Sequence, residues 1–353
     1  MLPHLTDRAP WFVFLFHFRG MDDLYRVGGT AFLRHYSRSE AELRTKLCSL
    51  PPLVTGELVF GFTAIRGEMI CIARMPDEMT TPYATQAIVE GVELAQQRGA
   101  RVIGLGALTS PVTGGGLKLL RYLPAGVTLT TGNAYTAAVV RHNVAEASAA
   151  LALDRQARVA VVGATGSLGV PASHLLAEAG YDLILVGRSA KRARDRLGSL
   201  AHQAVFAGDL GALREADVVV LLTSDPSARL APNQVRAGTV VIDCAQPSNV
   251  AASAYDEFRR RRVTVVEGGI VRIPEYACTM DIGLADPRDT FACLAETYLF
   301  AREGIREHSV GRPSAELARR LERAAQRHGV IPQPLGLRAH VRSGSPSSSS
   351  ICL

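Results

Sequence analysis

The sequence predicts an α/β protein with a doubly wound parallel sheet, and two observations carry that prediction. Six short apolar runs rich in β-branched residues lie between positions 159 and 266, as expected for strands buried on both faces of a sheet. A glycine-rich segment follows the first run and precedes a helix-like segment. We therefore expect a Rossmann-type doubly wound parallel sheet, plus an N-terminal α/β domain and C-terminal helices.

The first 150 residues are expected to mix strands and helices. Two runs of β-forming residues predict a hairpin that turns near Arg66-Gly67. Apolar residues spaced three and four apart predict a helix that ends before Gly99, where a C-cap would stand. The expected elements are strands at 11–18 and 101–108, a hairpin at 53–73, and helices at 80–98 and 139–151.

The second half of the chain begins with regular alternation of strands and helices. The six predicted strands lie at 159–162, 183–186, 204–206, 218–222, 240–242 and 263–266. After Gly269 we expect no further strand. Helices are predicted at 289–307 and 314–327, the second with Ser314 as N-cap, and the serine-rich tail is expected to be disordered.

Composition narrows the functional classes. No apolar run approaches the roughly 18–20 residues that span a bilayer, and the first ten residues do not resemble a secretory signal, so a cytoplasmic protein without integral membrane association is expected. The six cysteines form no CxxC pair, which argues against a disulfide framework and against a metal site.

The net charge is +6, and four consecutive arginines stand at 259–262. This charge suits attraction to an acidic partner such as an acyl carrier protein, or equally a solvated helix face. No nucleic-acid-binding motif accompanies the arginines, so no nucleic-acid partner is expected. The sequence does not indicate an oligomeric state.

The glycine-rich segment predicts a site for the phosphates of a dinucleotide. Its expected cofactor-binding residues are Gly163, Ala164, Thr165, Gly166, Ser167, Leu168 and Gly169. Glycines allow the tight turn, the approach of backbone to the pyrophosphate and close helix packing, and the helix N-terminus attracts the anion. Pro171 fits this prediction if it lies in the first helical turn. The alternative is a purely structural turn.

The end of the second predicted strand indicates which dinucleotide binds. An NAD enzyme usually places a carboxylate there, whereas this chain has Arg188, Ser189 and, shortly after, Arg192. A guanidinium matches a 2′-phosphate in charge and in bidentate geometry, so the sequence predicts NADPH as the cofactor. The alternative for both arginines is an exposed, structural role.

Cys293 is a candidate nucleophile on a predicted helix beyond the cofactor domain. A cysteine can attack a carbonyl carbon and hold an acyl group as a thioester, provided that its pKa is lowered, which the start of a helix favours. From the residues alone, Cys48, Cys244 and Cys278 remain alternatives.

Several short stretches of the sequence, spread along the chain, match the pattern of one known enzyme family and bear on the role of Cys293. They are Leu47-Cys-Ser-Leu-Pro-Pro, Thr130-Thr-Gly-Asn-Ala-Tyr-Thr-Ala, Gly163-Ala-Thr-Gly-Ser-Leu-Gly, Gly268-Gly-Ile-Val, Phe291-Ala-Cys-Leu-Ala-Glu, Gly311-Arg, His328-Gly and Pro332. Because these stretches keep the order and rough spacing of the family, the chain resembles the long-chain acyl-[acyl-carrier-protein] reductases of cyanobacteria from about residue 11 to 335. The resemblance implies NADPH-dependent reduction of an acyl thioester, carried by acyl carrier protein or coenzyme A, to an aldehyde, with Cys293 holding the acyl group.

Three stretches depart from the family pattern. Tyr135 replaces a histidine, Ser248 replaces a lysine, and Arg272-Ile-Pro-Glu-Tyr replaces a Glu-His-Ser run. If the active site uses those groups, its proton donor or its acyl pocket differs in this chain. Thr131, Asn133 and Tyr135 are candidate donors to the carbonyl oxygen, and Glu296 stands three residues after Cys293 and could orient its thiolate; a turn and an ion pair are the structural alternatives.

The expected organisation is an N-terminal substrate-binding domain at 1–150, an NADP(H)-binding domain at 151–275, a C-terminal helical segment with the catalytic cysteine at 276–340 and a disordered tail at 341–353. Two other functions stay open. One is a cysteine-independent, NADP-dependent dehydrogenase of an alcohol or amino acid. The other is an NADP-binding sensor or scaffold without turnover.

Overall fold

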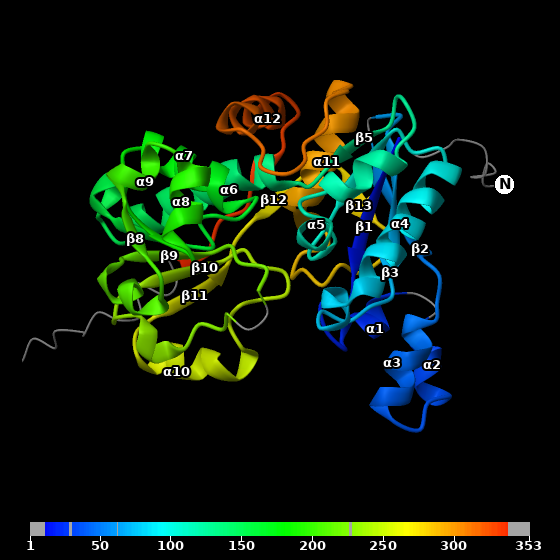
Figure 1. Ribbon diagram of the computed structural model, residues 1–353, viewed down its shortest axis with the longest axis horizontal. Helices are drawn as coiled ribbons and strands as arrows, with labels where there is room; N and C mark the ends of the chain where they lie inside the picture. The colour runs from blue at the N-terminus through cyan, green and yellow to red at the C-terminus, as the bar shows by residue number, and fades with distance from the viewer. Residues whose placement is uncertain (1–10, 28–29, 62, 226–227, 338–353) are drawn as a thin grey trace, which may run out of the picture.

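A computed structural model describes residues 11–27, 30–61, 63–225 and 228–337 of the chain. These residues form two six-stranded sheets and a small three-stranded sheet. Figure 1 shows the two large sheets side by side, with α11 (Ala292–Glu303) and α12 (Ala315–Arg327) at the top of the view and α6 (Asn133–Ala150) beneath α12. The predicted disordered tail lies outside the described residues.

The second large sheet is parallel throughout, with strand order β11-β10-β9-β6-β7-β8. This doubly wound order changes direction between β6 and β9, the place where such sheets bind ligands. All six predicted strands are confirmed, within one residue at each end: β6 (Arg158–Val162), β7 (Asp182–Val186), β8 (Val205–Ala207), β9 (Val218–Leu221), β10 (Val240–Asp243) and β11 (Thr264–Glu267).

Helices cover both faces of this sheet. Val159 and Val161 of β6 pack with α6 and with α7 (Gly169–Glu178), while Val219 and Val241 pack on the other face with Phe258 of α10 (Tyr255–Arg260). The short helices α8 (Ala190–Leu197) and α9 (Leu200–Gln203) follow β7. The central strands β6, β7, β9 and β10 are buried on both faces, which explains their near-continuous apolar runs, whereas the edge strands β8 and β11 are partly exposed.

The first large sheet is mixed, with strand order β13-β2-β3-β1-β4-β5. Parallel pairs join β3, β1, β4 and β5, while β2 and β13 run antiparallel at one edge. The strands are β1 (Phe12–His17), β2 (Leu53–Phe60), β3 (Arg66–Ile72), β4 (Val102–Leu105), β5 (Thr128–Thr130) and β13 (Tyr276–Cys278).

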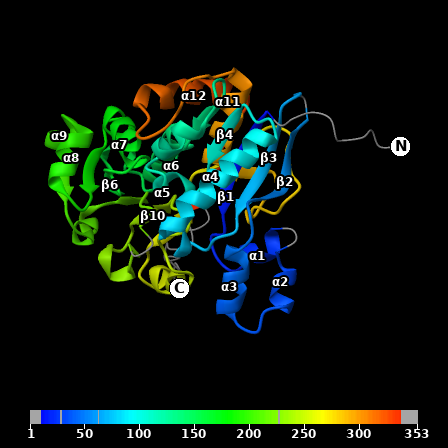
Figure 2. The ribbon, with the colours of Figure 1, turned by 45° about the vertical axis from the view of Figure 1, so that its right-hand side comes forward.

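Alternation along β1 places two different helices against this sheet. Val13 and Leu15 pack with α4 (Pro82–Gln97), and Phe12 and Phe14 lie in the core that includes α11. The remaining short helices are α1 (Asp23–Arg26), α2 (Phe32–His35), α3 (Glu40–Cys48) and α5 (Thr109–Val112). Figure 2 shows α1, α2 and α3 together at one end of the sheet.

Two expectations about local structure were wrong. Strands do continue after Gly269: β12 (Ile270–Arg272), β14 (Asp289–Phe291) and β15 (Ile331–Pro332) form the small antiparallel sheet, and β13 joins the first large sheet. These strands are two or three residues long, too short for an alternating pattern to be read. Arg66 and Gly67 lie within β3, because the hairpin turns earlier, between residues 60 and 66.

The predicted helices after residue 289 are present with shorter bounds. Ser314 caps α12, where its hydroxyl accepts a hydrogen bond from the Leu317 N–H, and α11 ends at Gly304 in the left-handed conformation. Pro171 lies in the first turn of α7, as predicted. None of the helices in the described part of the chain is long and apolar enough to cross a membrane.

Candidate active site

A cavity of about 890 Å³ lies between the two large sheets, and its lining comes from both. The glycine-rich segment after β6 forms one wall, and Cys293 at the start of α11 lies on another. The structure thus brings the two chemical features predicted from separate parts of the sequence into one space. The volume is large enough for a small-molecule cofactor together with a reacting group.

The glycine-rich loop is shaped by close backbone contacts. Gly163 adopts φ +88°, and its N–H donates to the Val186 carbonyl (3.0 Å). A side-chain carbon on Gly169 would lie 2.1 Å from the Gly163 carbonyl oxygen, so α7 can start this close to the loop only with glycine there. The loop therefore presents backbone N–H groups and a helix N-terminus to the cavity, which is an arrangement that binds phosphate.

The predicted cofactor residues divide into two groups. Gly163, Thr165, Gly166, Ser167, Leu168, Arg188, Ser189 and Arg192 line the cavity, whereas Ala164 and Gly169 are not among its lining residues. Ala164 is fully buried, and Gly169 packs against the loop itself.

The rim of the cavity beside β7 is strongly basic. Arg188 projects into solvent with 81% of its side chain exposed and lies 3.4 Å from Asp225, while Ser189 caps α8 by accepting a hydrogen bond from the Arg192 N–H. Burial, followed by the neighbouring charges of Arg312 and Arg192, lowers the pKa of Arg196. Clustered like charges at the mouth of a site favour an anionic ligand.

Cys293 is the second residue of α11 and is half-buried. Its backbone lies against Gly132, since a side-chain carbon on Gly132 would lie 2.2 Å from the Cys293 Cβ. Gly132 precedes α6, so the N-termini of two helices, α6 and α11, meet at the cysteine. Both helix dipoles place partial positive charge where an oxyanion or a thiolate would form.

Burial nevertheless raises the pKa of Cys293 to about 12. The backbone N–H groups of Leu294 and Cys293 act in the opposite direction, and the charge of Glu296 adds to the increase. The helix start thus acts in the expected direction, but desolvation of a thiolate outweighs it. Cys244 also lines the cavity, and burial raises its pKa as well.

Glu296 lies behind the cysteine, away from the cavity, and is fully buried. Its Oε1 accepts a hydrogen bond from the Thr130 hydroxyl (2.5 Å), and its Oε2 accepts one from the Tyr135 N–H (2.6 Å). It therefore satisfies N–H groups in the first turn of α6, a turn that has no side-chain cap at Gly132. Burial raises the pKa of Glu296.

The polar residues around Gly132 differ in orientation. Thr131 and Asn133 line the cavity, and the Thr131 hydroxyl donates to the Ser309 carbonyl (3.2 Å). The Tyr135 side chain is buried and does not belong to the lining, so its contribution here is the backbone N–H bound by Glu296. Asn133 is thus the member of this group that combines access to the cavity with a donor side chain.

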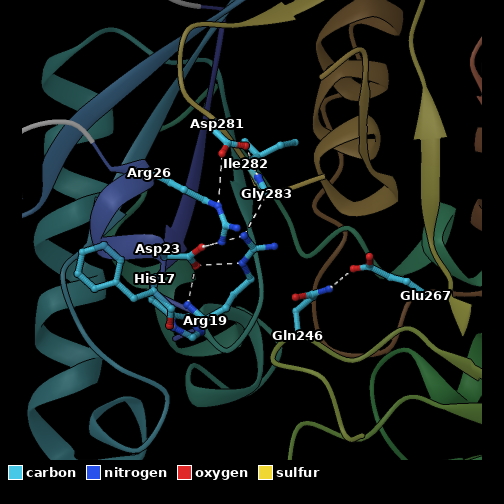
Figure 3. Close-up of polar contacts among 10 residues, drawn as sticks. His17, Arg19, Asp23, Arg26, Gln246, Glu267, Asp281, Ile282 and Gly283 are labelled. Carbon is cyan, nitrogen blue, oxygen red and sulfur yellow. Dashed lines mark hydrogen bonds and ion pairs between the residues drawn. The ribbon is translucent and has the colours of Figure 1, made fainter. Parts of the chain in front are cut away.

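A smaller cavity of about 60 Å³ adjoins the first and meets it at Cys293. The two cavities share Ala107, Gln246, Phe291 and Cys293. Figure 3 shows part of its surroundings, with Arg19, Asp23, Arg26 and Asp281 on one side of the gap and Gln246 on the other, where Gln246 hydrogen-bonds Glu267.

His17 lines the smaller cavity, but both of its ring nitrogens are engaged. Nδ1 lies 2.6 Å from the Phe18 carbonyl oxygen, and Nε2 accepts a hydrogen bond from the Leu108 N–H (3.1 Å). Burial lowers the pKa of His17 to about 4, so the ring is neutral at physiological pH. It cannot serve as the base that takes the Cys293 proton without losing these bonds.

Sequence reasoning did not single out Ala107 and Gln246. Ala107 has φ +49°, a backbone conformation that is unfavourable for alanine, and Gln246 precedes Pro247 after β10. The signal for Gln246 was its place in a stretch that departs from the family pattern. Ala107 follows β4 with no local motif, and only the fold brings it to Cys293.

Comparisons with known proteins place the chain among oxidoreductases. A family model described as shikimate / quinate 5-dehydrogenase matches residues 145–267. The long-chain acyl-[acyl-carrier-protein] reductase of Synechococcus elongatus is 31% identical over 315 residues, which are 82% of this chain and 89% of that protein.

Two further similarities are more limited. Aminotransferase PigE of a Serratia species is 26% identical over 260 residues, which are 70% of this chain but 30% of that protein. Among solved structures, shikimate dehydrogenase from Aquifex aeolicus matches 89% of this chain and 98% of its own, at 12% identity and a TM-score of 0.41. A likeness at that level says nothing about activity.

Proposed function

Since the chain belongs to the long-chain acyl-[acyl-carrier-protein] reductase family, we propose that it reduces an acyl thioester to an aldehyde with NADPH, through a covalent acyl-Cys293 intermediate. The observation that carries the proposal is that Cys293 and the glycine-rich loop line one cavity. The acyl donor is a thioester of acyl carrier protein or of coenzyme A. The basic rim of the cavity suits either donor, because both carry phosphate.

NADP(H) fits the residues that the loop supplies. The carbonyl of Gly163 and the backbone of Ala164 leave no room for a side chain at Gly169, and this close packing lets α7 point its N-terminus at the pyrophosphate. Arg188, Ser189 and Arg192 follow β7, where they would hold the 2′-phosphate. When bound there, NADPH supplies a hydride for the acyl carbon.

In the first half of the reaction, the Cys293 sulfur attacks the carbonyl carbon of the thioester. A bond forms between that carbon and Sγ, and the bond to the carrier sulfur breaks. The proton that leaves Cys293 is the one that the released carrier thiol needs, so proton transfer is balanced within this step. The N-termini of α6 and α11 stabilise the oxyanion of the tetrahedral intermediate, and the Asn133 side chain is a further donor.

In the second half, the carbonyl carbon of acyl-Cys293 gains a hydride, and the bond between this carbon and Sγ then breaks. The products are the aldehyde and, after a proton is taken up, the free thiol of Cys293. The same donors act again, because negative charge develops on the same oxygen. Glu296 holds the first turn of α6 in place through the Tyr135 N–H and is a positioning residue.

One observation favours an alternative, a dehydrogenase that does not use the cysteine. The raised pKa of Cys293 leaves little thiolate at neutral pH. In addition, Tyr135 points away from the cavity, and the Ser248 hydroxyl is bound to Asp243 (2.6 Å), so neither supplies a base. Such a dehydrogenase would keep most of its activity without Cys293.

The test measures NADPH oxidation with acyl thioesters of both carriers in the wild type, in Cys293→Ala and in Cys278→Ala. Cys278 lies on β13 and lines neither cavity, so it is the matched control. We expect Cys293→Ala to lose turnover by about 1,000-fold or more, with the control close to wild type. Mass spectrometry without cofactor should find an acyl adduct on Cys293 and none on Cys244. Turnover retained in Cys293→Ala would favour the dehydrogenase instead.

A further inference from the structure

One arginine reaches the larger cavity from outside the cofactor domain. Arg312 lines this cavity and lies between α11 and α12, in the Gly311-Arg pair that is among the stretches matched to the family. The other arginines of the lining are Arg188, Arg192 and Arg196, and all three follow β7. Arg312 therefore brings positive charge to the same space from a separate segment of the chain.

The backbone around Arg312 is fixed to the half of the molecule that contains the first sheet. The Gly311 N–H donates to the Gly115 carbonyl (2.7 Å), and a side-chain carbon on Gly115 would lie 2.9 Å from the Gly311 carbonyl oxygen. Just upstream, the Ser309 N–H donates to the Leu129 carbonyl of β5 (2.9 Å). Downstream, α12 packs against α6 and α7 of the other half (Figure 1). Arg312 thus stands where the chain passes from one half to the other.

No carboxylate neutralises Arg312 within the part of the chain that the structure describes. Its side chain is exposed, and its guanidinium forms neither an ion pair nor a hydrogen bond with any described residue. Among the same residues, Arg192 also has no carboxylate partner. Arg196 donates to the Thr165 carbonyl (2.7 Å), an uncharged group of the glycine-rich loop. Three guanidinium groups of the cavity lining therefore keep their positive charge uncompensated.

These three arginines lie close enough to act on one another. Burial lowers the pKa of Arg196, and the charges of Arg312 and Arg192 lower it further. Arg192 lies in the first turn of α8, and Arg312 lies two residues before Ser314, the N-cap of α12. Positive side chains are unfavourable near helix N-termini, which carry partial positive charge themselves. An anion that binds among these groups removes this repulsion.

The position of Arg196 indicates which anion this is. Its partner Thr165 belongs to the loop between β6 and α7, where we expect the pyrophosphate of NADP(H). Arg188 and Ser189 follow β7, where the 2′-phosphate is expected, and Arg192 and Arg196 continue from there as neighbours four residues apart on α8. A guanidinium that joins Arg192 and Arg196 therefore meets the 2′-phosphate, whose oxygens accept from more than one arginine.

We propose that Arg312 binds the 2′-phosphate of NADPH together with Arg192 and Arg196, so that arginines from two separate parts of the chain select the cofactor. This inference requires only that the chain binds NADP(H), and it does not depend on the reduction of a thioester. A guanidinium offers two parallel N–H groups to phosphate oxygens, a geometry that an ammonium group cannot supply. NADH has a hydroxyl in place of this phosphate and gains little from Arg312.

The test measures the dissociation constants of NADPH and NADH by fluorescence titration in the wild type, in Arg312→Ala and in Arg312→Lys. We expect Arg312→Ala to raise the constant for NADPH by about tenfold and that for NADH by less than about twofold. Arg312→Lys should lie between Arg312→Ala and the wild type for NADPH. Arg306→Ala is the matched control, because Arg306 is an exposed arginine of the same segment and lines neither cavity.

Two fragments of the cofactor isolate the phosphate. In calorimetric titrations, Arg312→Ala should bind adenosine 2′,5′-bisphosphate about tenfold more weakly than the wild type does, and adenosine 5′-monophosphate with nearly the same affinity. Thermal unfolding distinguishes this from a structural role. Without cofactor, Arg312→Ala should unfold at the wild-type temperature, whereas the increase in this temperature that NADPH causes should be smaller than in the wild type.

The other outcomes contradict the assignment in distinguishable ways. Equal weakening of NADPH and NADH would place Arg312 on the pyrophosphate instead. Unchanged NADPH affinity with an increased KM for coenzyme A thioesters would place it on a phosphate of the acyl donor. Unchanged affinity with earlier unfolding would leave Arg312 a purely structural residue. Failure of the wild type to reduce any thioester would overturn the proposed function alone, because these binding measurements do not require turnover.

Discussion

The two walls of the active-site cavity are built in different ways. The cofactor wall is centred on one continuous loop between β6 and α7, made of backbone groups and close-packed glycines, with arginines that follow β7 at its rim. The cysteine wall is assembled from segments far apart in the chain, including Ala107, Gly132, Gln246 and Cys293. The first can therefore be recognised from local sequence, whereas the second exists only once two sheets and α11 have packed together.

The difference extends to electrostatics. The cofactor wall faces solvent and carries arginines at its rim, among them the exposed Arg188. The cysteine wall is desolvated, so burial raises the pKa of Cys293 and that of Glu296 behind it. The cofactor wall therefore suits an anionic ligand, whereas burial disfavours the thiolate form of Cys293 in the cysteine wall.

The largest expected effect sharpens this electrostatic contrast. Because the pKa of Cys293 is raised to about 12, its thiolate fraction should rise tenfold for each unit by which the pH is increased, as long as the pH stays below that pKa. Alkylation of Cys293 by iodoacetamide should accelerate by about 1,000-fold from roughly pH 6.5 to 9.5. Peptide mass spectrometry, with Cys293→Ala as control, assigns the rate to this residue. A rate that is already constant above neutral pH would mean that the helix N-termini dominate.

The next effect concerns the cofactor wall alone. In Gly169→Ala the new methyl carbon would lie 2.1 Å from the Gly163 carbonyl oxygen, so the loop must shift. We expect the dissociation constant of NADPH, measured by fluorescence titration, to rise by about 100-fold or more, while acylation of Cys293 is nearly unchanged. Gly20→Ala is the control, because a side-chain carbon on Gly20 meets nothing within 4 Å. Parallel loss of acylation would show that the two walls are not independent.

The reciprocal change affects the cysteine wall. Gly132 has φ +75°, and a side-chain carbon there would lie 2.2 Å from the Cys293 Cβ. Gly132→Ala should slow acylation by about 30-fold, yet keep the NADPH dissociation constant within about threefold of wild type. Gly126→Ala controls for backbone strain alone, since Gly126 has φ +88° and open space around it. If Gly169→Ala and Gly132→Ala change NADPH binding and acylation in the same way, the two walls do not act separately.

The smallest effect tests the choice of dinucleotide. Arg188 has most of its side chain exposed, and its guanidinium lies 3.4 Å from the carboxylate of Asp225. Arg188→Ala should raise the dissociation constant of NADPH by about tenfold, because a charge-assisted hydrogen bond is lost. Binding of NADH should change little. Equal weakening of both cofactors would place Arg188 on the pyrophosphate or the adenine instead.

The success of the sequence-based predictions also differs between features that are local in the chain and features that tertiary contacts assemble. The six strands of the second sheet, the turn at Gly163 and the cap at Ser314 depend on residues adjacent in the chain, and all were confirmed. The orientation of Tyr135 and the partners of Glu296 depend on contacts across more than 160 positions, which no local pattern encodes. The strands β12, β14 and β15 were missed because their pairing is tertiary and each is very short.

The position of α6 has a practical consequence for recombining this protein with its relatives. Its first turn lies against Cys293 and donates the Tyr135 N–H to the carboxylate of Glu296, while Val140 and Val144 further along lie in the core that includes β6 and β9. The match to the dehydrogenase family model begins at residue 145, inside this same helix. A chimera that exchanges the cofactor module should therefore keep α6 whole and carry α11 and α12 with it. A junction inside α6 would join a helix start fitted to one cysteine wall to a helix end fitted to a foreign sheet.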